Sequence, residues 1–292
     1  MLYLCGFHEI FFVIKLNDGG CFLEKILTFL VLRFKNMIFD THAHYDDEQF
    51  DIDREELLAA MKDGGIGNIV DVGASMASSE RALELAHKYD FIYAAVGVHP
   101  SEVEEMDDSS IERLRELSKD EKCVAIGEIG LDYHWPDPSP ELQKIWFKRQ
   151  IQLARETRLP IIIHSRDAAQ DTLEIMKSEH VEDIGGVVHC FSYSAEVAAE
   201  CVKMGFYIGI GGVLTFKNAR KMVEVAEKTP IEKIILETDC PYLAPEPYRG
   251  KRNNSLYLPN VVKKMAEVKN MSEADVIRIT EENARKMYGI SR

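Results

Sequence analysis

The chain has 292 residues, of which 46% are hydrophobic and 29% are charged, and this composition is typical of a globular protein with a substantial core. Its formal net charge of −14 excludes a protein that coats nucleic acid with a uniformly basic surface, so any polyanionic substrate has to be bound by local positive charge. The six cysteines include no CxxC pair and are too dispersed for a disulfide-stapled secreted domain, which favours reduced thiols and a cytoplasmic location.

Residues 1–36 differ in composition from the rest of the chain. Their apolar runs, IFFVI and ILTFLVL, fall short of the ~20 apolar residues that a membrane span needs. The start MLYLCGFHE has no basic region, which argues against a signal peptide. We therefore expect residues 1–36 to be a leader that is a misassigned start or poorly ordered, with the functional domain over 37–292. A segment that caps this domain or binds weakly to a membrane surface is the alternative.

From Met37 onward, short apolar runs alternate with amphipathic, charge-rich segments, as expected for βα units around a parallel sheet. Eight runs are predicted to be strands: 37–44, 66–73, 92–99, 123–130, 159–165, 185–191, 206–212 and 233–239. Helices are predicted between them, among others over 53–63, 76–88, 140–157 and 218–228, with another over 273–287 after the last strand. Eight such units predict a single-domain α/β fold, the (β/α)8 TIM-type barrel.

A doubly wound open sheet would show the same alternation, so the position of the polar residues has to decide between the two folds. Several His, Glu and Asp residues lie in or just beyond the carboxyl-terminal part of a predicted strand. This is the end at which barrels build their active sites, whereas an open sheet would spread the residues along a crevice. Their placement therefore favours the barrel.

The segment FDTHAH places His42 and His44 two residues apart at the end of a strand, so both imidazoles point to one face. Two neutral imidazole nitrogens suit a cation such as Zn²⁺ or Mn²⁺. Taken alone, the pair could equally be hydrogen-bonded structural residues.

Four further candidate ligands, Glu128, His164, His189 and Asp239, each end a separate strand. Closure of a barrel would bring them to one mouth with the first pair, where clustered charges are costly without cations. The set therefore predicts two divalent metal ions (Mg, Mn or Zn). Glu128, on the middle strand of the ligand sequence, is the natural bridge between them.

Several motifs resemble those of the TatD family of metal-dependent deoxyribonucleases, within the wider amidohydrolase-like superfamily. They are IFDTHAHYDD, AVGVHP, AIGEIGLDYHW, PIIIHSRDA, VVHCFS and ILETDCPYLAPEPYRGKRNN, and the resemblance extends from Met37 almost to the C-terminus. It implies a hydrolase that uses magnesium or manganese to cleave phosphodiester bonds in DNA with a metal-activated water, expected to be exonucleolytic and to prefer single strands. The chain departs from the family at Tyr193, where a glycine is frequent, and at Ser255, where a proline is frequent. Both positions are expected on loops that face the mouth.

The resemblance also implies a role for each ligand. His42, His44 and Asp239 would hold one cation and His164 and His189 the other, with Glu128 bridging the two. Asp239 would act as general base toward the attacking water, which makes Asp239 and Glu128 the expected catalytic residues.

Four residues outside this set are predicted to contact substrate. His99 ends the third strand in GVHP, although a purely structural histidine is equally open. Arg249, Lys251 and Arg252 follow the last strand in YRGKRNN, where they would supply the local positive charge that the acidic chain otherwise lacks. A solvated charge run is the alternative for this segment.

Arg166 follows the fifth strand directly after His164 and Ser165. It could reach a phosphate, or it could pair with the neighbouring Asp167.

Two other functions remain open. An amidohydrolase-type hydrolase of a small-molecule amide, lactone or phosphoester would use the same metals in a closed pocket, with apolar lid residues where this chain has Arg249, Lys251 and Arg252. A non-catalytic binding scaffold would require the loss of a ligand position, and no such position is lost. We expect DNA as the partner, in single-stranded form, with no membrane partner and a monomeric chain.

Overall fold

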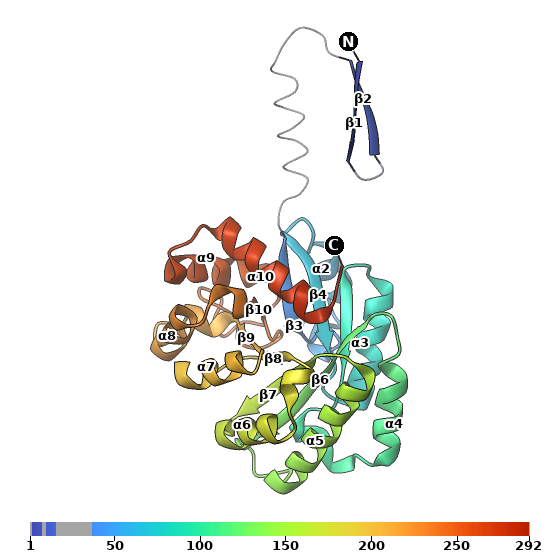
Figure 1. The fold of residues 1–292 in the computed structure, drawn as a ribbon, viewed down its shortest axis with the longest axis vertical. Coiled ribbons are helices and arrows are strands. Elements are labelled where there is room, and N and C mark those ends of the chain that lie inside the picture. The colour runs from blue at the N-terminus through green and yellow to red at the C-terminus, as the bar shows by residue number, and fades with distance from the viewer. Residues whose placement is uncertain (1, 8–9, 16–36, 292) are drawn as a thin grey trace. The chain divides into compact units, whose positions relative to one another are not determined.

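The structure is a computed structural model that describes residues 2–7, 10–15 and 37–291. The chain divides into two units, Met1–Asn36 and Met37–Arg292, each of which is described by itself. In the first unit, β1 (Leu2–Phe7) pairs antiparallel with β2 (Ile10–Lys15) (Figure 1). Residues 1, 8–9 and 16–36 lie outside the described residues, so the expectation of a poorly ordered or misassigned leader stays a prediction.

The second unit is the expected (β/α)8 barrel. Its eight strands are parallel, and each pairs with its neighbours in sequence. They are β3 (Ile38–Ala43), β4 (Ile66–Val72), β5 (Ile92–Val96), β6 (Cys123–Asp132), β7 (Ile161–Arg166), β8 (Gly186–Val188), β9 (Tyr207–Ile210) and β10 (Ile234–Leu236). A bridge between Ala43 and Cys240 brings the two ends of the sheet together.

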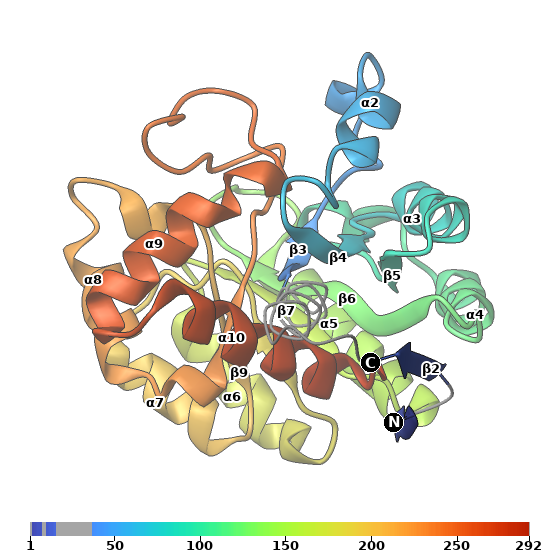
Figure 2. The same cartoon turned by 90° about the horizontal axis from the view of Figure 1, so that it is seen from above.

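The helices of this unit surround the strands, with α3 and α4 on one side and α7 and α8 on the other (Figures 1 and 2). They are α2 (Arg54–Ala59), α3 (Met76–Lys88), α4 (Asp108–Leu117), α5 (Pro140–Thr157), α6 (Ala169–Ser178), α7 (Ala195–Lys203), α8 (Arg220–Lys228), α9 (Leu258–Lys269) and α10 (Glu273–Tyr288). Short 3-10 helices cover Glu48–Phe50, Pro100–Glu105, Val181–Asp183, Gly212–Thr215, Ile231–Lys233 and Ser255–Tyr257. None of the described helices is both long and apolar enough to cross a membrane.

Helix α5 illustrates why these segments fold as predicted. Ser139 accepts a hydrogen bond from the backbone N–H of Leu142, and Pro140 occupies the first turn, where its missing N–H costs nothing. The helix ends where Arg158 adopts a left-handed conformation with φ 59°. Its start and end therefore match the predicted range of 140–157.

Two apolar layers hold the barrel together. One lies between strands and helices, and the other joins strand residues such as Phe39, Val72 and Ile235 to Met287 and Tyr288 of α10. Tyr288 stacks on Phe39 with ring centroids 6.1 Å apart and donates its hydroxyl hydrogen to the carbonyl of Thr41. Helix α10 thus closes the end of the barrel at which the strands begin, which leaves the carboxyl-terminal ends of the strands for the functional site.

Three predicted strands end three residues earlier than expected. β5 stops at Val96, β8 at Val188 and β10 at Leu236, so His99, His189 and Asp239 lie on the loops that follow. Asp239 has φ 56°, which is incompatible with continued strand geometry. The chain therefore leaves the sheet just before these three residues, and their side chains lie on loops at the mouth of the barrel.

Candidate metal centre

A cavity of about 1410 Å³ opens at the carboxyl-terminal ends of the strands. The structure brings all six candidate ligands to it: five line the cavity and His42 is buried beneath them, 1% exposed. Three of them belong to strands β3, β6 and β7, namely His42, Glu128 and His164. The other three lie on the loops after β3, β8 and β10, namely His44, His189 and Asp239.

One cluster consists of His42, His44 and Asp239. The Nε2 atoms of the two histidines are 3.1 Å apart. Asp239 Oδ1 lies 3.8 Å from Nε2 of His42 and 3.5 Å from Nε2 of His44. Three potential donor atoms thus face one point.

A second cluster consists of Glu128, His164 and His189. Glu128 Oε1 lies 2.7 Å from His164 Nδ1 and 2.6 Å from His189 Nε2. The two histidine nitrogens are 3.2 Å apart.

Glu128 lies between the two clusters. While Oε1 faces the second cluster, Oε2 lies 3.5 Å from His42 Nε2 and 3.8 Å from His44 Nε2 in the first. The side chain comes from β6, whose ten residues are all buried, so its position is fixed by the sheet. One carboxylate therefore reaches both groups, as a bridging ligand requires.

The donor set fits divalent cations. His44 Nδ1 donates to the carbonyl of Val72 at 2.7 Å, so the lone pair of the neutral ring lies on Nε2, inside the cluster. On the outer side of His164, Nε2 lies 3.0 Å from Asp132 Oδ2, which leaves Nδ1 as its inner nitrogen. Lone pairs of imidazoles and carboxylates that face each other repel unless a cation or a proton lies between them.

The pKa values of the histidines at the centre differ: burial, followed by the charge of His189, lowers the pKa of His42 to about 4, whereas two other rings have raised values. Burial lowers the pKa of His44, but the hydrogen bond to Asp239 and the charge of Glu128 raise it to about 10. Burial likewise lowers the pKa of His164, and Asp132 and Glu128 raise it to about 9. In the metal-free protein, protons on these rings balance the carboxylates, and bound cations would replace them.

The lining of the cavity is acidic overall. It includes ten Asp or Glu residues against four Lys or Arg residues. Such a surface attracts cations and repels a phosphate group unless cations are bound first.

His99 also lies at the centre, with Nε2 3.8 Å from Glu128 Oε1. The backbone N–H of Ser101 donates to His99 Nδ1 at 3.1 Å, so the neutral ring carries its proton on Nε2. Burial, followed by the charge of His164, lowers the pKa of His99 to about 3 and keeps the ring neutral. In this tautomer, His99 offers the cavity an N–H donor rather than a metal ligand.

The three basic residues of the loop after β10 lie elsewhere, and none of them is among the described residues that line the cavity. Arg252 donates to Asp53 at 2.5 Å and packs over Phe50. The guanidinium of Arg249 lies 4.3 Å from the ring centre of Phe216. Lys251 Nζ lies 5.8 Å from the ring centre of Tyr248. Their role in substrate binding stays a prediction.

The expectation that Tyr193 and Ser255 face the mouth is wrong, because polar groups inside the fold hold both side chains. Ser255 is fully buried and donates to Asp40 Oδ2 at 2.6 Å. The Tyr193 hydroxyl accepts a hydrogen bond from the backbone N–H of Ala168 at 3.0 Å. Neither residue lines the cavity as described.

Two acidic residues were missed by the sequence reasoning. Asp132 contacts His164, and Glu237 lies with His42 and His189 in a third buried group. Both had a usable signal, because Asp132 follows Glu128 by four residues and Glu237 precedes Asp239 by two. Even spacing in an extended segment places side chains on the same face.

Several known proteins resemble this chain. The sequence model of the family described as TatD related DNase matches residues 39–289. A relative from Bacillus subtilis, the uncharacterized metal-dependent hydrolase YabD, is 48% identical over 255 residues, which are 87% of this chain and 100% of the relative. The 3'-5' ssDNA/RNA exonuclease TatD of Cronobacter sakazakii is 33% identical over 257 residues, which are 86% of this chain and 97% of that protein.

Among solved structures, the TatD homologue YJJV from Escherichia coli superposes with a TM-score of 0.82 at 32% sequence identity. The match covers 87% of this chain and 98% of that one. The fold, the family motifs and the relatives agree, and the chain belongs to the TatD family of metal-dependent hydrolases.

Proposed function

We propose that this hydrolase cleaves phosphodiester bonds in DNA, that it prefers single strands and digests them from an end, and that it uses two divalent cations. The observation that carries the proposal is the position of Glu128, whose two oxygens face two separate groups of donors. A pair of cations held around one carboxylate suits displacement at phosphorus, where charge develops on the attacking and leaving oxygens. The cytoplasm is the compartment expected for this activity.

In this proposal, His42, His44 and Asp239 would hold one cation, His164 and His189 would hold the other, and Glu128 would contact both. When bound, the cations neutralise the phosphate and make a nearby water more acidic. Asp239 then takes the proton of the attacking water, because its side chain is 17% exposed whereas that of Glu128 is 4% exposed. Burial raises the pKa of Asp239, but the hydrogen bond to His44 and the charges of the histidines lower it overall, so Asp239 stays ionised at neutral pH.

We infer that two side chains bind the phosphate itself. His99 supplies its Nε2–H donor beside the centre. Arg166, at the end of β7, lines the cavity, and its guanidinium has no hydrogen-bond or ion-pair partner among the described side chains. The expected alternative partner, Asp167, faces His134 at 3.4 Å instead.

The other three basic residues of the cavity are already engaged. Arg54 and Arg81 are bound to Asp51 and Asp46, at 2.7 and 3.1 Å, and Lys88 is bound to Glu55. We therefore assign the first phosphate contact to Arg166 and leave Arg249, Lys251 and Arg252 as candidates for more distant phosphates.

Exposed aromatic side chains at the rim support a single-stranded substrate. Trp135 is 57% exposed and Tyr242 is 54% exposed, and both line the cavity. Aromatic rings bind unstacked bases without sequence preference, at ~1–3 kcal/mol per base, whereas bases inside a duplex are not available for this contact. The name of the Cronobacter relative extends the proposal to RNA as a second substrate to be tested.

The test is digestion of end-labelled single- and double-stranded DNA and of single-stranded RNA by metal-free protein, with Mg²⁺, Mn²⁺ or Zn²⁺ added back. We expect loss of nucleotides from one end of single-stranded DNA only when metal is present, and no loss with Glu128→Gln under the same conditions. Hydrolysis of small esters, lactones or amides by a protein that leaves all three polymers intact would refute the proposal in favour of a small-molecule hydrolase.

A further inference from the structure

Each metal-binding histidine has an outer ring nitrogen that needs a partner of its own. A neutral imidazole binds a cation through one nitrogen and carries its hydrogen on the other, which usually donates to a carboxylate, a carbonyl or a water. For two of the four histidines the partner is evident. His44 Nδ1 contacts the carbonyl of Val72 at 2.7 Å, and His164 Nε2 contacts Asp132 Oδ2 at 3.0 Å.

For the other two histidines no partner is evident. The Nδ1 atoms of His42 and His189 are buried and have no hydrogen-bond partner among the residues that the structure describes. The two rings stack with their centroids 3.9 Å apart and an interplanar angle of 10°. One of them belongs to each half of the centre, since Nε2 of His42 faces the first cluster and Nε2 of His189 faces Glu128 Oε1.

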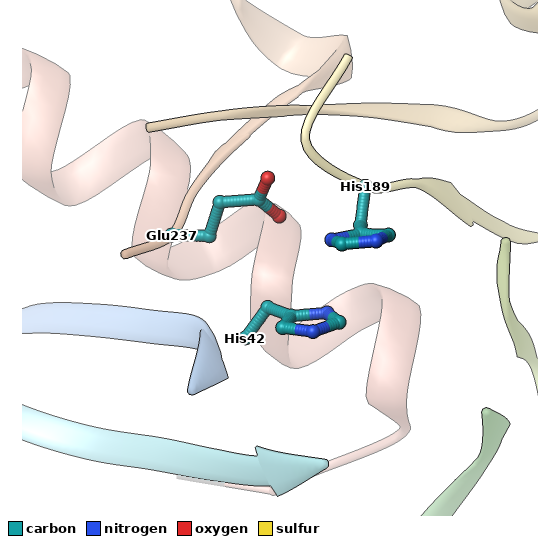
Figure 3. Close-up of side chains that lie close together, drawn as sticks. All are labelled: His42, His189 and Glu237. Carbon is teal, nitrogen blue, oxygen red and sulfur yellow. The ribbon is translucent and has the colours of Figure 1, made fainter. Parts of the chain in front are cut away.

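The same region contains a carboxylate oxygen that can accept hydrogen bonds and has no donor within the described ranges. Glu237 Oε2 is buried and equally without a partner in the described part of the chain. One donor or acceptor atom from each of His42, His189 and Glu237 lies within 4.8 Å of the others. Figure 3 shows the carboxylate beside the two stacked rings.

The carboxylate of Glu237 is held in place from two sides. Its other oxygen, Oε1, accepts the backbone N–H of Cys190, the residue after His189. Gly209 of β9 leaves the room that Oε2 occupies, because a Cβ atom at this position would lie 2.3 Å from it. Glu237 is therefore packed with Oε2 toward the histidines and not toward the cavity, which its side chain does not line.

The chemistry of this group fits a hydrogen-bond acceptor rather than a third cation. If Nε2 of each histidine faces the metal centre, both Nδ1 atoms carry hydrogens, and two N–H groups repel a cation but bind an anion. One polar atom from each of the three residues lies within 4.8 Å of the others, a separation that one bridging water can span, and a buried water requires two to four polar partners.

We propose that Glu237 is a positioning residue that accepts the Nδ1–H hydrogens of both His42 and His189, directly or through one buried water. It thereby fixes the tautomer and orientation of one histidine from each cluster and couples the two clusters through a single side chain. This assignment rests on the proposed function in one respect, which is that Nε2 of each ring faces the metal centre.

The test is a long-range ¹H–¹⁵N correlation spectrum of histidine-labelled protein loaded with Zn²⁺, because protons replace the cations on the inner nitrogens when metal is absent. We expect His42 and His189 to carry hydrogen on Nδ1 in the wild-type protein. In Glu237→Gln the amide has one oxygen, which the N–H of Cys190 occupies, and its NH₂ group would then face the two rings. At least one ring should change to the Nε2–H tautomer, and Zn²⁺ affinity from chelator competition should fall ~10–100-fold for both cations.

The matched control is Asp71→Asn. Asp71 is another fully buried carboxylate with one unpartnered oxygen, but it binds the backbone N–H of Tyr45 and does not lie in the group of Figure 3. Its replacement should leave the tautomers of His42 and His189 unchanged. Glu237→Asp, whose carboxylate can still reach the rings through a water, should restore the Nδ1–H tautomer.

Wild-type spectra with Nε2–H on either ring would overturn the assignment without any variant. Equal loss of Zn²⁺ affinity in Glu237→Gln and Asp71→Asn, with unchanged tautomers, would also overturn it, because it would show a merely structural effect. Since no readout uses nucleic acid, the tautomers can be as expected in a protein that fails to cleave DNA, and the two proposals are tested separately.

Discussion

Replacement of Glu128 by Gln keeps the volume of the side chain and removes its charge and one of its two ligand oxygens. In the native protein, Oε1 lies within 2.7 Å of both nitrogens of the second cluster, and Oε2 lies 3.5 and 3.8 Å from those of the first. An amide has a single oxygen, and its NH₂ group cannot bind a cation. Whichever way the amide turns, one cluster loses its oxygen.

The two clusters differ in how much they would retain. The first keeps His42, His44 and Asp239, whereas the second keeps only His164 and His189. We therefore expect one cation to be retained and the other to be lost. Loss of a hydrogen-bond partner on the outer side of a ligand weakens metal binding ~10–100-fold, so loss of a direct ligand should cost more than about 1.4–2.8 kcal/mol. Because removal of one transition-state contact can lower kcat ~10²–10³-fold, the rate on single-stranded DNA should fall at least as far.

Metal content after dialysis and the rate of release of labelled nucleotide measure the two effects. Circular dichroism checks that the barrel is folded. Glu102→Gln is the control, because this exposed residue lines the same cavity without belonging to either cluster. A Glu128→Gln protein that binds two cations and cleaves at a near-normal rate would refute the bridging role.

Three further predictions concern substrate binding and the leader. Arg166→Ala should raise KM for single-stranded DNA. It should also reduce the slope of the logarithm of the DNA-binding constant against the logarithm of salt concentration by ~0.7, the value for one phosphate contact. An unchanged slope would show that Arg166 does not bind the substrate. If the loop after β10 contacts more distant phosphates, replacement of Arg249, Lys251 and Arg252 together by Ala should reduce the salt slope of DNA binding further. Lower stability with an unchanged slope would instead show that these side chains only pack on aromatic rings, namely Phe216, Tyr248 and Phe50. A chain that starts at Met37 should fold and cleave normally, as measured by thermal unfolding and nucleotide release, and loss of solubility or most activity would show that the leader supports the barrel.

The sequence predicted the barrel and the six converging residues for identifiable reasons. Alternating apolar runs have the period of βα units, and the carboxyl ends of parallel strands meet at one mouth, so His42 and Asp239 could be brought together although they lie far apart in the chain. Even spacing makes Asp132 and Glu237 candidates for the outer partners of the histidines, but it does not show which imidazole each of them contacts. Whether Asp132 or Glu237 faces an imidazole depends on register shifts in β6 and on the exit of the chain from β10, and strand period alone does not specify either.

The basic loop shows a second limit of the sequence. Arg249, Lys251 and Arg252 follow the last strand, as expected for a segment near the mouth, but the direction of long side chains on a loop depends on nearby aromatic rings. Arg166, by contrast, does not form the ion pair that its neighbour Asp167 could have offered, because Asp167 has φ 55° and its side chain faces His134. Local backbone geometry, rather than composition, decides which cation stays unpaired.

The central claim is that two cations share Glu128 at the mouth of the barrel. Crystals loaded with Mn²⁺ and measured at the manganese absorption edge test it most directly, because anomalous scattering locates each metal independently of activity. We expect two peaks ~3.5–4 Å apart, one beside His42, His44 and Asp239 and one beside His164 and His189, with Glu128 contacting both. A single peak, or two peaks of which one does not contact Glu128, would contradict it.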